Sequence, residues 1–393
     1  MKLLHLADLH LGKTVLEAPM LEEQEAFLKK ILELVDERGV DAVLMAGDLY
    51  DRSVPPAEAV ELLDGFLSAL SGRGIPVLAA AGNHDSPERL DFGSRIFTRG
   101  GLYIAGRYRP ELTRVRLADA HGPVDVTLLP FLRPVTVRAA LSTAPQEQDG
   151  EKGEAGIRTT EDAVRAALAA CPPEPGVRQV LVAHQFVCAG GMPPATCDSE
   201  TPYAGGVEAV DVSCFDGYDY VALGHLHRPQ RVGRDTVRYA GSPLKYSLSE
   251  AGHVKSCPLV TLGLTGVEDI ELIPLRPLHD LRRVKGELEE LLQMGRGREE
   301  AGDYLWAVLT GERVPDPAER LRTVYPRLLH VEYQQYTAGG SVEEEIQAEK
   351  ALSPGELFER FYHTMTGGEP TARQRELLTA ALDRAARKEE KAV

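Results

Sequence analysis

Short apolar runs alternate with amphipathic segments along the first two-thirds of the chain, and this alternation restricts the fold more than any other feature. The runs KLLHLA, DAVLMA and IPVLAA have the length and apolar content of buried strands. Residues 20–37 and 57–70 instead place apolar side chains at helical spacing. Further strands are expected at VDVTLLP, VRQVLVA and YDYVAL. Strands that lead into helices in this way predict an α/β fold.

The chain is expected to hold more than one domain, because 393 residues exceed the length of a typical single domain. The pattern starts afresh after Gly263. VEDIELIPL, a helix near 282–294, DYLWAVLTG, a helix near 317–324 and LLHVEYQQY would together make a β-α-β-α-β set. We therefore predict a first domain over 1–263 and a smaller one over 264–337.

Polar segments lie within and after these domains. Residues 142–176 are rich in Pro, Gly, Glu and Gln, which predicts a mobile surface excursion around a short helix at 161–170. Residues 338–352 form an acidic linker, and 353–393 are expected to form a helical hairpin. Its helices open with capping boxes, Ser353 with Glu356 and Thr371 with Gln374. So small a hairpin is not stable alone, and we expect it to dock on the parent domain or on a partner.

The composition favours a reduced, cytoplasmic protein. No stretch approaches the roughly 18 apolar residues of a membrane span, and the first residues lack the order of a signal peptide. The five cysteines include no CxxC pair, so we interpret them as reduced thiols. The net charge of −16 argues against wrapping of nucleic acid over a wide surface, because phosphate affinity comes from Lys and Arg. A local basic track is still compatible with this charge.

Five short polar loops each follow an apolar run. They are ADLH with Asp8 and His10, GDLYD with Asp48 and Asp51, GNHD with Asn83, His84 and Asp85, AHQ with His184, and GHLH with His225 and His227. Fixed oxygen and nitrogen ligands on rigid strand ends are what a divalent cation needs. In DLH and HLH the two-residue spacing would point both side chains to the same side of a strand end. Each loop alone could be an ordinary turn, but five together predict a metal site.

The first loop, ADLHLGKT, also fits a loose phosphate-binding P-loop with Ala7 in place of the first glycine. A P-loop brings backbone amides to phosphate through glycines, with no anionic side chain in the way. Here the carboxylate of Asp8 would repel phosphate unless a metal ion lay between them. We therefore interpret the loop as a metal loop, and we expect Lys13 and Thr14 to lie just past the site.

In this order, D-x-H, GD-x-x-D, GNHD, a solitary His and GH-x-H resemble the motifs of the calcineurin-like metallophosphoesterases. The longer forms LHLADLHLGK, AGDLYDRSVPP, AGNHDSPERL, ALGHLHRPQ and YAGSPLKYSLSE are similar to the SbcD branch, bacterial nuclease subunits related to the double-strand-break repair nuclease of archaea and eukaryotes. The resemblance is strong over about residues 1–260 and weaker beyond. It implies a four-layer α/β/β/α sandwich, a DNA-capping domain and a C-terminal hairpin that binds an ATPase partner.

The resemblance also implies roles for the loop residues, with two divalent ions and a preference for manganese. The first ion would be held by Asp8, His10, Asp48 and His227, and the second by Asp48, Asn83, His184 and His225. His84 matches the catalytic histidine of the family, which would stabilise the transition state or protonate the leaving 3′-oxygen. From adjacency alone, Asp85 is expected to orient that imidazole. Archaeal relatives carry a histidine where this chain has Asp51, so Asp51 is given no catalytic role.

The implied activity is that of a manganese-dependent DNA nuclease, a 3′–5′ exonuclease and a hairpin and single-strand endonuclease. It would act as a homodimer with an SbcC-type coiled-coil ATPase in DNA end processing, replication, recombination and repair. With the P-loop excluded, any ATP dependence would come from that partner. The candidate DNA contacts are Arg89, Arg107, Arg109, Arg228, Lys245, Arg282, Arg283 and Lys285.

Two alternatives stay open at this point. One is another phosphoesterase of the same fold, a protein phosphatase or cyclic-nucleotide phosphodiesterase, because GDLYDRS comes within one residue of the GD-x-x-DRG of Ser/Thr phosphatases. Those enzymes place Arg before GNH and Glu after it, whereas this chain has Ala81 and Asp85 there. The other is a non-catalytic scaffold that tethers an ATPase to DNA, although degenerate scaffolds usually lose ligands and none is missing here.

Overall fold

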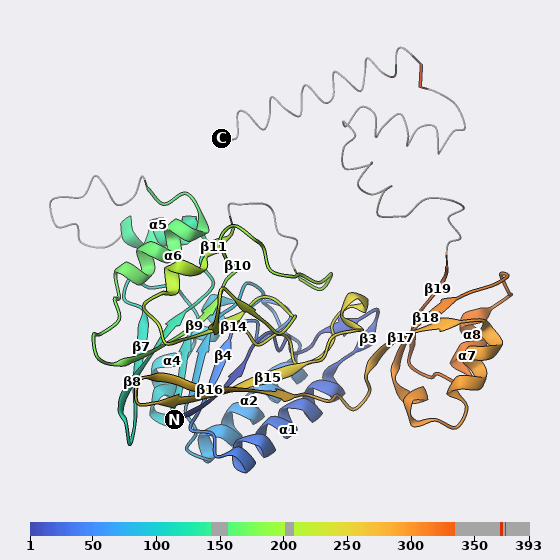
Figure 1. The fold of residues 1–393 in the computed structure, drawn as a ribbon, viewed down its shortest axis with the longest axis horizontal. Helices are drawn as coiled ribbons and strands as arrows, with labels where there is room; N and C mark the ends of the chain where they lie inside the picture. The colour runs from blue at the N-terminus through green and yellow to red at the C-terminus, as the bar shows by residue number, and fades with distance from the viewer. Residues whose placement is uncertain (143–155, 201–207, 335–369, 372–373, 375–393) are drawn as a thin grey trace. The chain divides into compact units, whose positions relative to one another are not determined.

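The computed structural model describes residues 1–142, 156–200, 208–334, 370, 371 and 374 (Figure 1). The chain divides into two compact units, Met1–Glu332 and Tyr333–Val393. Almost all of the described residues belong to the first unit, and its described part holds two six-stranded sheets and one three-stranded sheet. Two short strand pairs accompany them. These are β2 Thr14–Val15 with β3 Ala18–Pro19, and β10 Val187–Cys188 with β11 Val210–Asp211.

The first sheet has the strand order β16-β15-β1-β4-β5-β6. The bounds are β1 Lys2–Leu6, β4 Ala42–Ala46, β5 Val77–Ala80, β6 Leu102–Ala105, β15 Ser256–Gly263 and β16 Gly266–Pro274. Strands β1, β4, β5 and β6 run parallel, with Leu3 opposite Ala42 and Val43 opposite Val77. Because the carboxyl ends of parallel strands meet at one edge, the loops after β1, β4 and β5 emerge together.

The second sheet has the order β13-β14-β12-β9-β8-β7. The bounds are β7 Thr113–Asp119, β8 Gly122–Leu129, β9 Arg178–His184, β12 Tyr220–Gly224, β13 Gln230–Val232 and β14 Arg234–Tyr239. Strands β8, β9, β12 and β14 are parallel, with Val180 opposite Val126 and Tyr220. The loops after β8, β9 and β12 therefore also share one edge.

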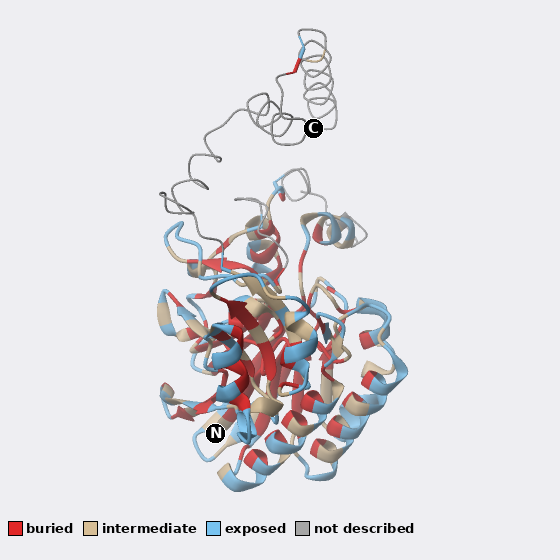
Figure 2. Ribbon diagram, turned by 90° about the vertical axis from the view of Figure 1, so that its right-hand side faces the viewer, coloured by how far each residue is buried: buried red, intermediate tan, exposed pale blue. Residues whose placement is uncertain are grey.

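The two large sheets bury apolar side chains against each other. Leu44 of β4 and Val182 of β9 belong to one fully buried cluster that takes residues from both sheets. Their neighbours Val43 and Leu181 point the opposite way, as alternation along a strand requires, and each packs in a separate cluster with helices. Figure 2 shows the strands mostly buried, whereas the helices present one buried side. The α/β class predicted from the sequence is therefore confirmed.

Helices α1, α2 and α6 of this part follow the expected positions, whereas α3, α4 and α5 were not predicted. Their bounds are α1 Leu21–Arg38, α2 Ala57–Gly72, α3 Pro87–Asp91, α4 Ser94–Phe97, α5 Pro134–Ser142 and α6 Thr160–Ala169. Helix α1 buries Phe27 and Ile31 and ends at Gly39, which adopts the left-handed conformation that glycine tolerates. Helix α6 begins with a capping box, because Thr159 Oγ1 accepts from the Asp162 amide and the Asp162 carboxylate accepts from the Thr159 amide.

The third sheet lies in the smaller predicted domain and has the order β17-β18-β19. The bounds are β17 Leu281–Gly286, β18 Tyr304–Leu309, β19 Leu328–Tyr333, α7 Leu288–Gly295 and α8 Pro317–Arg322. The helix expected near 282–294 is therefore wrong in its first half, which is strand β17. Parallel pairing with the buried strand β18 overrides the helical preference of LRRVKG, and the helix starts only after Gly286.

The strand VEDIELIPL was also assigned to the wrong sheet. It is β16, which pairs antiparallel with β15 along its whole length, in the first sheet. The cause is a tight hairpin in which Gly263 pairs with Gly266 across a two-residue loop, Leu264 and Thr265. The sequence change after Gly263 marks a turn within one sheet, and the bounds of the predicted domains stay a prediction.

The three-stranded sheet contacts the first sheet region through both apolar and charged groups. Leu281 and Tyr304 share an apolar cluster with Met20 and Tyr246. Glu23, fully buried on α1, accepts from the backbone amides of residues 278 and 279 and lies 2.6 Å from Nδ1 of His279. These contacts place the start of the smaller sheet beside helix α1.

The expectations for the cysteines, for membrane-spanning helices and for the C-terminal segment have different outcomes. All five cysteines are free thiols in the structure. Among the described helices none is long and apolar enough to cross a membrane. The linker 338–352 and most of the hairpin 353–393 lie outside the described residues. Its second capping box is described, since the Thr371 amide donates to Gln374 Oε1 at 2.8 Å and the Gln374 amide donates back to Thr371 Oγ1 at 3.4 Å.

Candidate metal centre

The five predicted loops meet where the carboxyl edges of the two large sheets face each other. Asp8 and Asp48 follow β1 and β4, and Asn83 follows β5. His184 ends β9 of the other sheet, and its Nε2 atom lies 2.9 Å from the Asn83 side-chain oxygen. The structure thus brings all seven predicted ligands, and His84 with them, into one group.

One cluster of ligands surrounds His10. Its Nε2 atom lies 3.0 Å from Nε2 of His227 and 3.6 Å from Oδ2 of Asp48. Asp8, His10 and His227 are buried, and each offers a ligand atom within 4.8 Å of the other two. This cluster joins loops after β1, β4 and β12.

A second cluster surrounds Asn83. Its side-chain oxygen lies 2.9 Å from His184 Nε2 and 3.0 Å from His225 Nδ1. His184 Nε2 is also 3.3 Å from Asp48 Oδ2. Because Asp48 reaches both His10 and His184, its carboxylate connects the two clusters, as a bridging ligand between two ions would.

The chemistry of this donor set fits divalent metal ions. The Nε2 atoms of His10 and His227, 3.0 Å apart, are close enough for both to bind one cation. The Oδ2 atom of Asp8 is buried and has no hydrogen-bond partner among the described residues, which is costly without a ligand. Imidazole, carboxylate and amide groups together suit first-row divalent ions.

The ligand loops are held in strained backbone conformations. Seven of the described non-glycine residues have a positive φ angle, and four of them are proposed ligands, namely Asp8 (52°), His10 (44°), Asp48 (50°) and His225 (108°). Such residues cost of order 1–3 kcal/mol each and concentrate at functional sites. The expectation that a straight strand end aims Asp8 and His10 to one side is therefore wrong, because β1 ends at Leu6 and the left-handed turns aim them.

Glycines make room for the ligands. A Cβ atom on Gly47 would overlap the ring of His184, and one on Gly82 would overlap the Asp48 carboxylate. At Gly224 it would overlap the carbonyl oxygen of Ala46, which belongs to the other sheet. Only glycine lets the loops approach in this way.

His84 lies against the first cluster and is half-buried. Its amide donates to Asp48 Oδ1 at 2.9 Å, and its Nδ1 atom lies 3.0 Å from the carbonyl oxygen of Asp51. Its ring is 4.8 Å from that of His10, nearly perpendicular to it. The backbone carbonyl of Asp51 therefore fixes the orientation of the imidazole.

The role expected for Asp85 is wrong. Its carboxylate accepts from the backbone amides of Gly82, Leu49 and Tyr50 at 2.9, 3.2 and 3.0 Å. These bonds tie the loop after β5 to the loop after β4, and none of them reaches His84. Asp85 is thus a brace between two ligand loops.

The loop after β1 is unsuited to phosphate, in agreement with the metal interpretation. The amides of Asp8, His10 and Leu11 donate to carbonyl oxygens of the loop after β4. Lys13 lies just past these residues and pairs with Asp51, with 2.7 Å between Nζ and Oδ1. The amides and the cation that a P-loop needs are already engaged.

A buried polar network behind His227 was missed by the sequence reasoning. Ser199 Oγ donates to Glu250 Oε1 at 2.6 Å and therefore accepts from His227 Nδ1, 2.7 Å away. Lys255 donates to the other oxygen of Glu250 at 2.5 Å and to the His227 carbonyl at 2.8 Å. Such partners fix the tautomer of a ligand histidine and leave its Nε2 atom free for metal. Glu250 belongs to the quoted stretch YAGSPLKYSLSE, but nothing in its spacing marks it.

The protonation of the histidines agrees with a metal-binding role. Burial lowers the pKa of His225 to about 3 and that of His227 to about 4, so both imidazoles are neutral near pH 7. Burial also acts to lower the pKa of His184, but the facing carboxylate of Asp48 outweighs it and raises that pKa to about 9. A bound cation would replace the proton that His184 otherwise holds.

The side chains expected to contact DNA differ in how far they are exposed and in whether they already pair with other groups. Arg107 donates to Glu88 and Arg109 to Asp91, both at exposed positions. Lys245 is nearly buried and binds Asp280 and the Leu281 carbonyl, so it joins the smaller sheet to the body. Arg89, Arg228, Arg283 and Lys285 are exposed.

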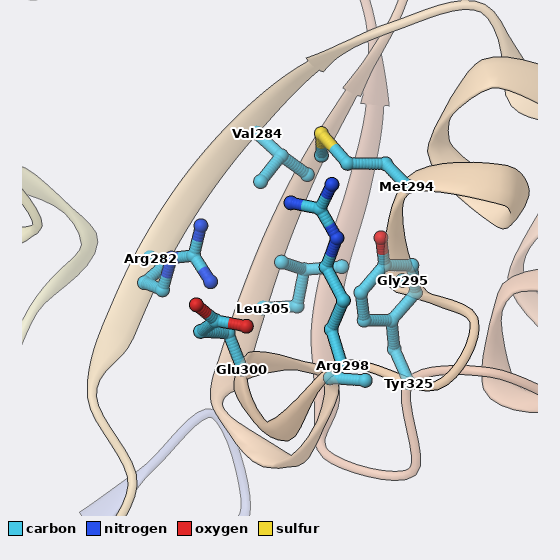
Figure 3. A pocket seen from close by; sticks show the side chains of 9 residues that line it. Arg282, Val284, Met294, Gly295, Arg298, Glu300, Leu305 and Tyr325 are labelled. Carbon is cyan, nitrogen blue, oxygen red and sulfur yellow. The ribbon is translucent and has the colours of Figure 1, made fainter.

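Arg282 has acidic neighbours in the smaller sheet. It lines a small cavity of about 40 Å³ together with Arg298, Glu300 and Tyr325 (Figure 3). Its guanidinium also lies 3.5 Å from the Asp303 carboxylate. A cavity of this size admits water but not a nucleotide.

A sixth loop reaches the same edge and was not predicted. It follows β8, and its Phe131 ring stacks on the His225 imidazole with centroids 6.3 Å apart and planes at 18°. Part of the signal was present, since VDVTLLP was a predicted strand, but its parallel pairing with β9 is seen only in the structure. Given that pairing, its carboxyl end emerges beside His184.

Facing strand-end loops with two linked clusters of metal ligands define the class of metal-dependent phosphoesterases. The family model of calcineurin-like phosphoesterases matches residues 1–229, more than half of the chain. A model described as the type 5 capsule protein repressor C-terminal domain matches residues 277–366.

Curated relatives match almost the whole chain. The D subunit of the nuclease SbcCD from Staphylococcus saprophyticus is 31% identical over 392 residues, which cover 98% of this chain and 99% of the relative. That of Staphylococcus epidermidis is 30% identical over 374 residues, 93% and 94% of the two chains. The chain therefore belongs to the calcineurin-like phosphoesterases and, within them, to the SbcD nuclease subunits. It is a metal-dependent phosphodiester hydrolase.

Solved structures give weaker matches. A dimetal phosphatase from Danio rerio is 12% identical with a TM-score of 0.37, covering 70% of this chain and 99% of that one. The protein TT1561 of Thermus thermophilus is 14% identical with a TM-score of 0.38 and the same coverages. With scores this low, neither likeness supports an inference about the chain.

Proposed function

We propose that this chain is a manganese-dependent DNA nuclease that removes nucleotides from 3′ ends and cuts hairpins and single strands. It would act in the cytoplasm with an SbcC-type ATPase in DNA end processing, recombination and repair. The observation that supports this most is the Asp48 carboxylate between two clusters of buried and half-buried ligands. The near full-length similarity to the D subunit of SbcCD supports DNA as the substrate.

In this proposal each cluster holds one ion. Asp8, His10, Asp48 and His227 hold the first, and Asp48, Asn83, His184 and His225 hold the second. When bound, two divalent ions would supply Lewis-acid stabilisation for the attacking and leaving oxygens of the phosphodiester. The braced loops, together with the hydrogen bonds that His184 makes to the Ala46 carbonyl and His227 to Ser199, would hold the ligands in place for them.

His84 is the proposed catalytic residue. Because the Asp51 carbonyl accepts from Nδ1, the Nε2 atom is the one available to substrate. There it would stabilise charge on the phosphate or donate a proton to the leaving 3′-oxygen, which is general acid catalysis. Its half-buried position beside His10 suits this contact.

The remaining parts of the chain would serve binding. We propose that the two large sheets with their outer helices form the four-layer α/β/β/α sandwich, and that the smaller domain caps the DNA. The hairpin 353–393 would grip the coiled-coil ATPase. The relatives are named as one subunit of a nuclease, SbcCD, and that name supports such a complex.

A homodimer is part of the proposal, and one surface supports it. Phe92 directly follows α3, Ile96 and Phe97 belong to α4, and the three are 80%, 70% and 40% exposed. Exposed apolar patches of this kind mark interfaces. Changing Ile96→Glu should turn a dimer into a monomer in light scattering, whereas a dimer that persists would exclude this surface.

The direct test is digestion of end-labelled duplex DNA by the purified chain with manganese, with magnesium or with a chelator. The proposal expects manganese-dependent shortening from the 3′ ends and none with chelator. A phosphopeptide runs in parallel as the competing substrate. Phosphate release from the peptide while DNA stays intact would replace the proposal with a protein phosphatase.

A further inference from the structure

A pocket of about 460 Å³ opens directly beside the second ligand cluster. Asn83 and His225 form one side of it, and the loop after β8 with helix α5 forms another. Its lining residues are Asn83, Phe131, Leu132, Arg133, Pro134, Val135, Arg138, Arg158, Thr160, Phe186, Glu208 and His225. The metal ligands need no such space, so the pocket calls for another occupant.

The pocket has an apolar and aromatic wall. Phe131 stacks on His225, and Phe186 meets the same imidazole edge-on with centroids 6.1 Å apart. Val135, at the start of α5, is 60% exposed although it faces this wall. An exposed valine in a pocket that two phenylalanine rings also line is a surface that gains from being covered by a flat apolar group.

The pocket is also a basic spot on an acidic chain. Three arginines and one glutamate line it, whereas the whole chain carries a net charge of −16. The guanidinium of Arg133 lies over the Phe131 ring at 5.8 Å. Arg138 is anchored by donating to the Ile157 carbonyl at 2.5 Å. Guanidinium groups beside aromatic rings are the combination that single-stranded nucleic acid binds.

A second pocket shares Asn83, Phe131 and Arg133 with the first and is less suited to a nucleotide. Asp85 and Glu88 line it together with Arg107 and Arg133, so its charged side chains balance. Arg107 is moreover paired with Glu88, which leaves less positive charge for a phosphate than the first pocket offers. The volume of the first pocket falls within the roughly 300–1,000 Å³ that small-molecule sites occupy.

We propose that this pocket receives the base of the nucleotide next to the scissile phosphodiester. The base would pack against Phe131 and Val135, and Arg133 would face the adjoining phosphate. The proposal rests on the proposed function, since it requires a nucleic acid at the metal centre. It predicts that the enzyme uses the base, of any sequence, to position the reacting bond.

The test compares the manganese-dependent hydrolysis of two esters. Methyl p-nitrophenyl phosphate has a methyl group where thymidine 5′-(p-nitrophenyl) phosphate has a nucleoside, so only the second can place a base in the pocket. For the wild type, kcat/KM should favour the thymidine ester. Phe131→Ala should reduce that preference about tenfold, the scale of one base–aromatic contact, while the base-free ester is still hydrolysed. Phe131→Trp should restore the preference.

Two further variants separate base binding from support of His225. Val135→Asp touches no ligand and should also lower the preference, whereas Val254→Asp, at a valine 77% exposed elsewhere, should not. If Phe131→Ala lowered kcat/KM equally for both esters and Val135→Asp left the preference unchanged, the proposal that the pocket binds the base would be overturned. Hydrolysis of both esters by the wild type without preference would also overturn it, but would leave the proposed function standing. Hydrolysis of neither ester overturns both proposals.

Discussion

For single residues at the site, the sequence predicts which side chains gather there better than it predicts how they are oriented. The five loops that carry the proposed ligands could be picked out because Asp, Asn and His after apolar runs are unusual in this number, whereas the choice of seven ligands among their residues came from the family resemblance. Their geometry could not be predicted, since it depends on left-handed turns at Asp8, His10 and Asp48. Asp85 illustrates the difference. Adjacency in the chain suggested a contact with His84, but the carboxylate turns back to three backbone amides.

The first prediction concerns His84. In His84→Ala, turnover on DNA should fall by about 10²–10⁴, the usual contribution of general acid–base catalysis, while manganese affinity stays unchanged. Manganese titration by calorimetry and single-turnover kinetics measure the two effects separately. A comparable loss of manganese affinity would mean that His84 is a ligand, as its place near His10 and Asp48 also allows.

The second prediction concerns Glu250. Glu250→Gln should weaken manganese binding about 10- to 100-fold, because the network then no longer fixes the tautomer of His227. Since the variant leaves the Lys255 charge buried, the double variant with Lys255→Met serves to keep the protein folded. Unfolding midpoints report on folding, and Glu289→Gln on an exposed helix surface is the control. Unchanged manganese affinity in a folded variant would show that this network does not contribute to metal binding.

At the scale of elements, parallel pairing does most of the positioning. The strands β1, β4, β5, β9 and β12 could be predicted from their apolar runs, and their loops then had to meet at carboxyl edges. The local sequence pattern gave the wrong secondary structure or the wrong sheet where pairing with another strand decides the conformation. LRRVKG reads as helix but is a strand because β18 lies beside it, and VEDIELIPL joins β15 through a two-residue hairpin.

The approach of β12 to β4 gives the third prediction. Gly224→Ala should destabilise the protein by about 3 kcal/mol, because the added methyl overlaps the Ala46 carbonyl. Gly65→Ala is the matched control, since nothing lies near that exposed helical glycine, and it should stabilise by about 1 kcal/mol. Denaturant unfolding measures both. A neutral Gly224→Ala would show that the sheets can separate at this edge without cost.

At the scale of the whole molecule, the acidic net charge is compatible with the proposed nuclease function, because basic side chains are needed only where the phosphates of the substrate bind. The arginines around Phe131 form such a local spot, which net charge could not reveal. Tertiary contacts between distant segments, such as Glu23 with His279, likewise leave no mark in local sequence. The extent of the smaller domain was therefore harder to predict than its strands.

The fourth prediction separates catalysis from partner binding. Deleting residues 353–393 should abolish co-purification with an SbcC-type ATPase, because the proposed grip is gone. Manganese-dependent hydrolysis of the base-free ester should stay within about twofold, since the described ligands all lie before residue 230. A pull-down and an ester assay on the same preparation test this. Retained ATPase binding would place the partner surface elsewhere.

The central claim is that Asp48 joins two metal ions into one hydrolytic centre. The most direct measurement counts manganese ions per chain and nuclease turnover in the same samples of wild type and Asp48→Ala. The account predicts two ions in the wild type, and in the variant the loss of activity together with at least one ion. A variant that keeps two ions and wild-type turnover would contradict it.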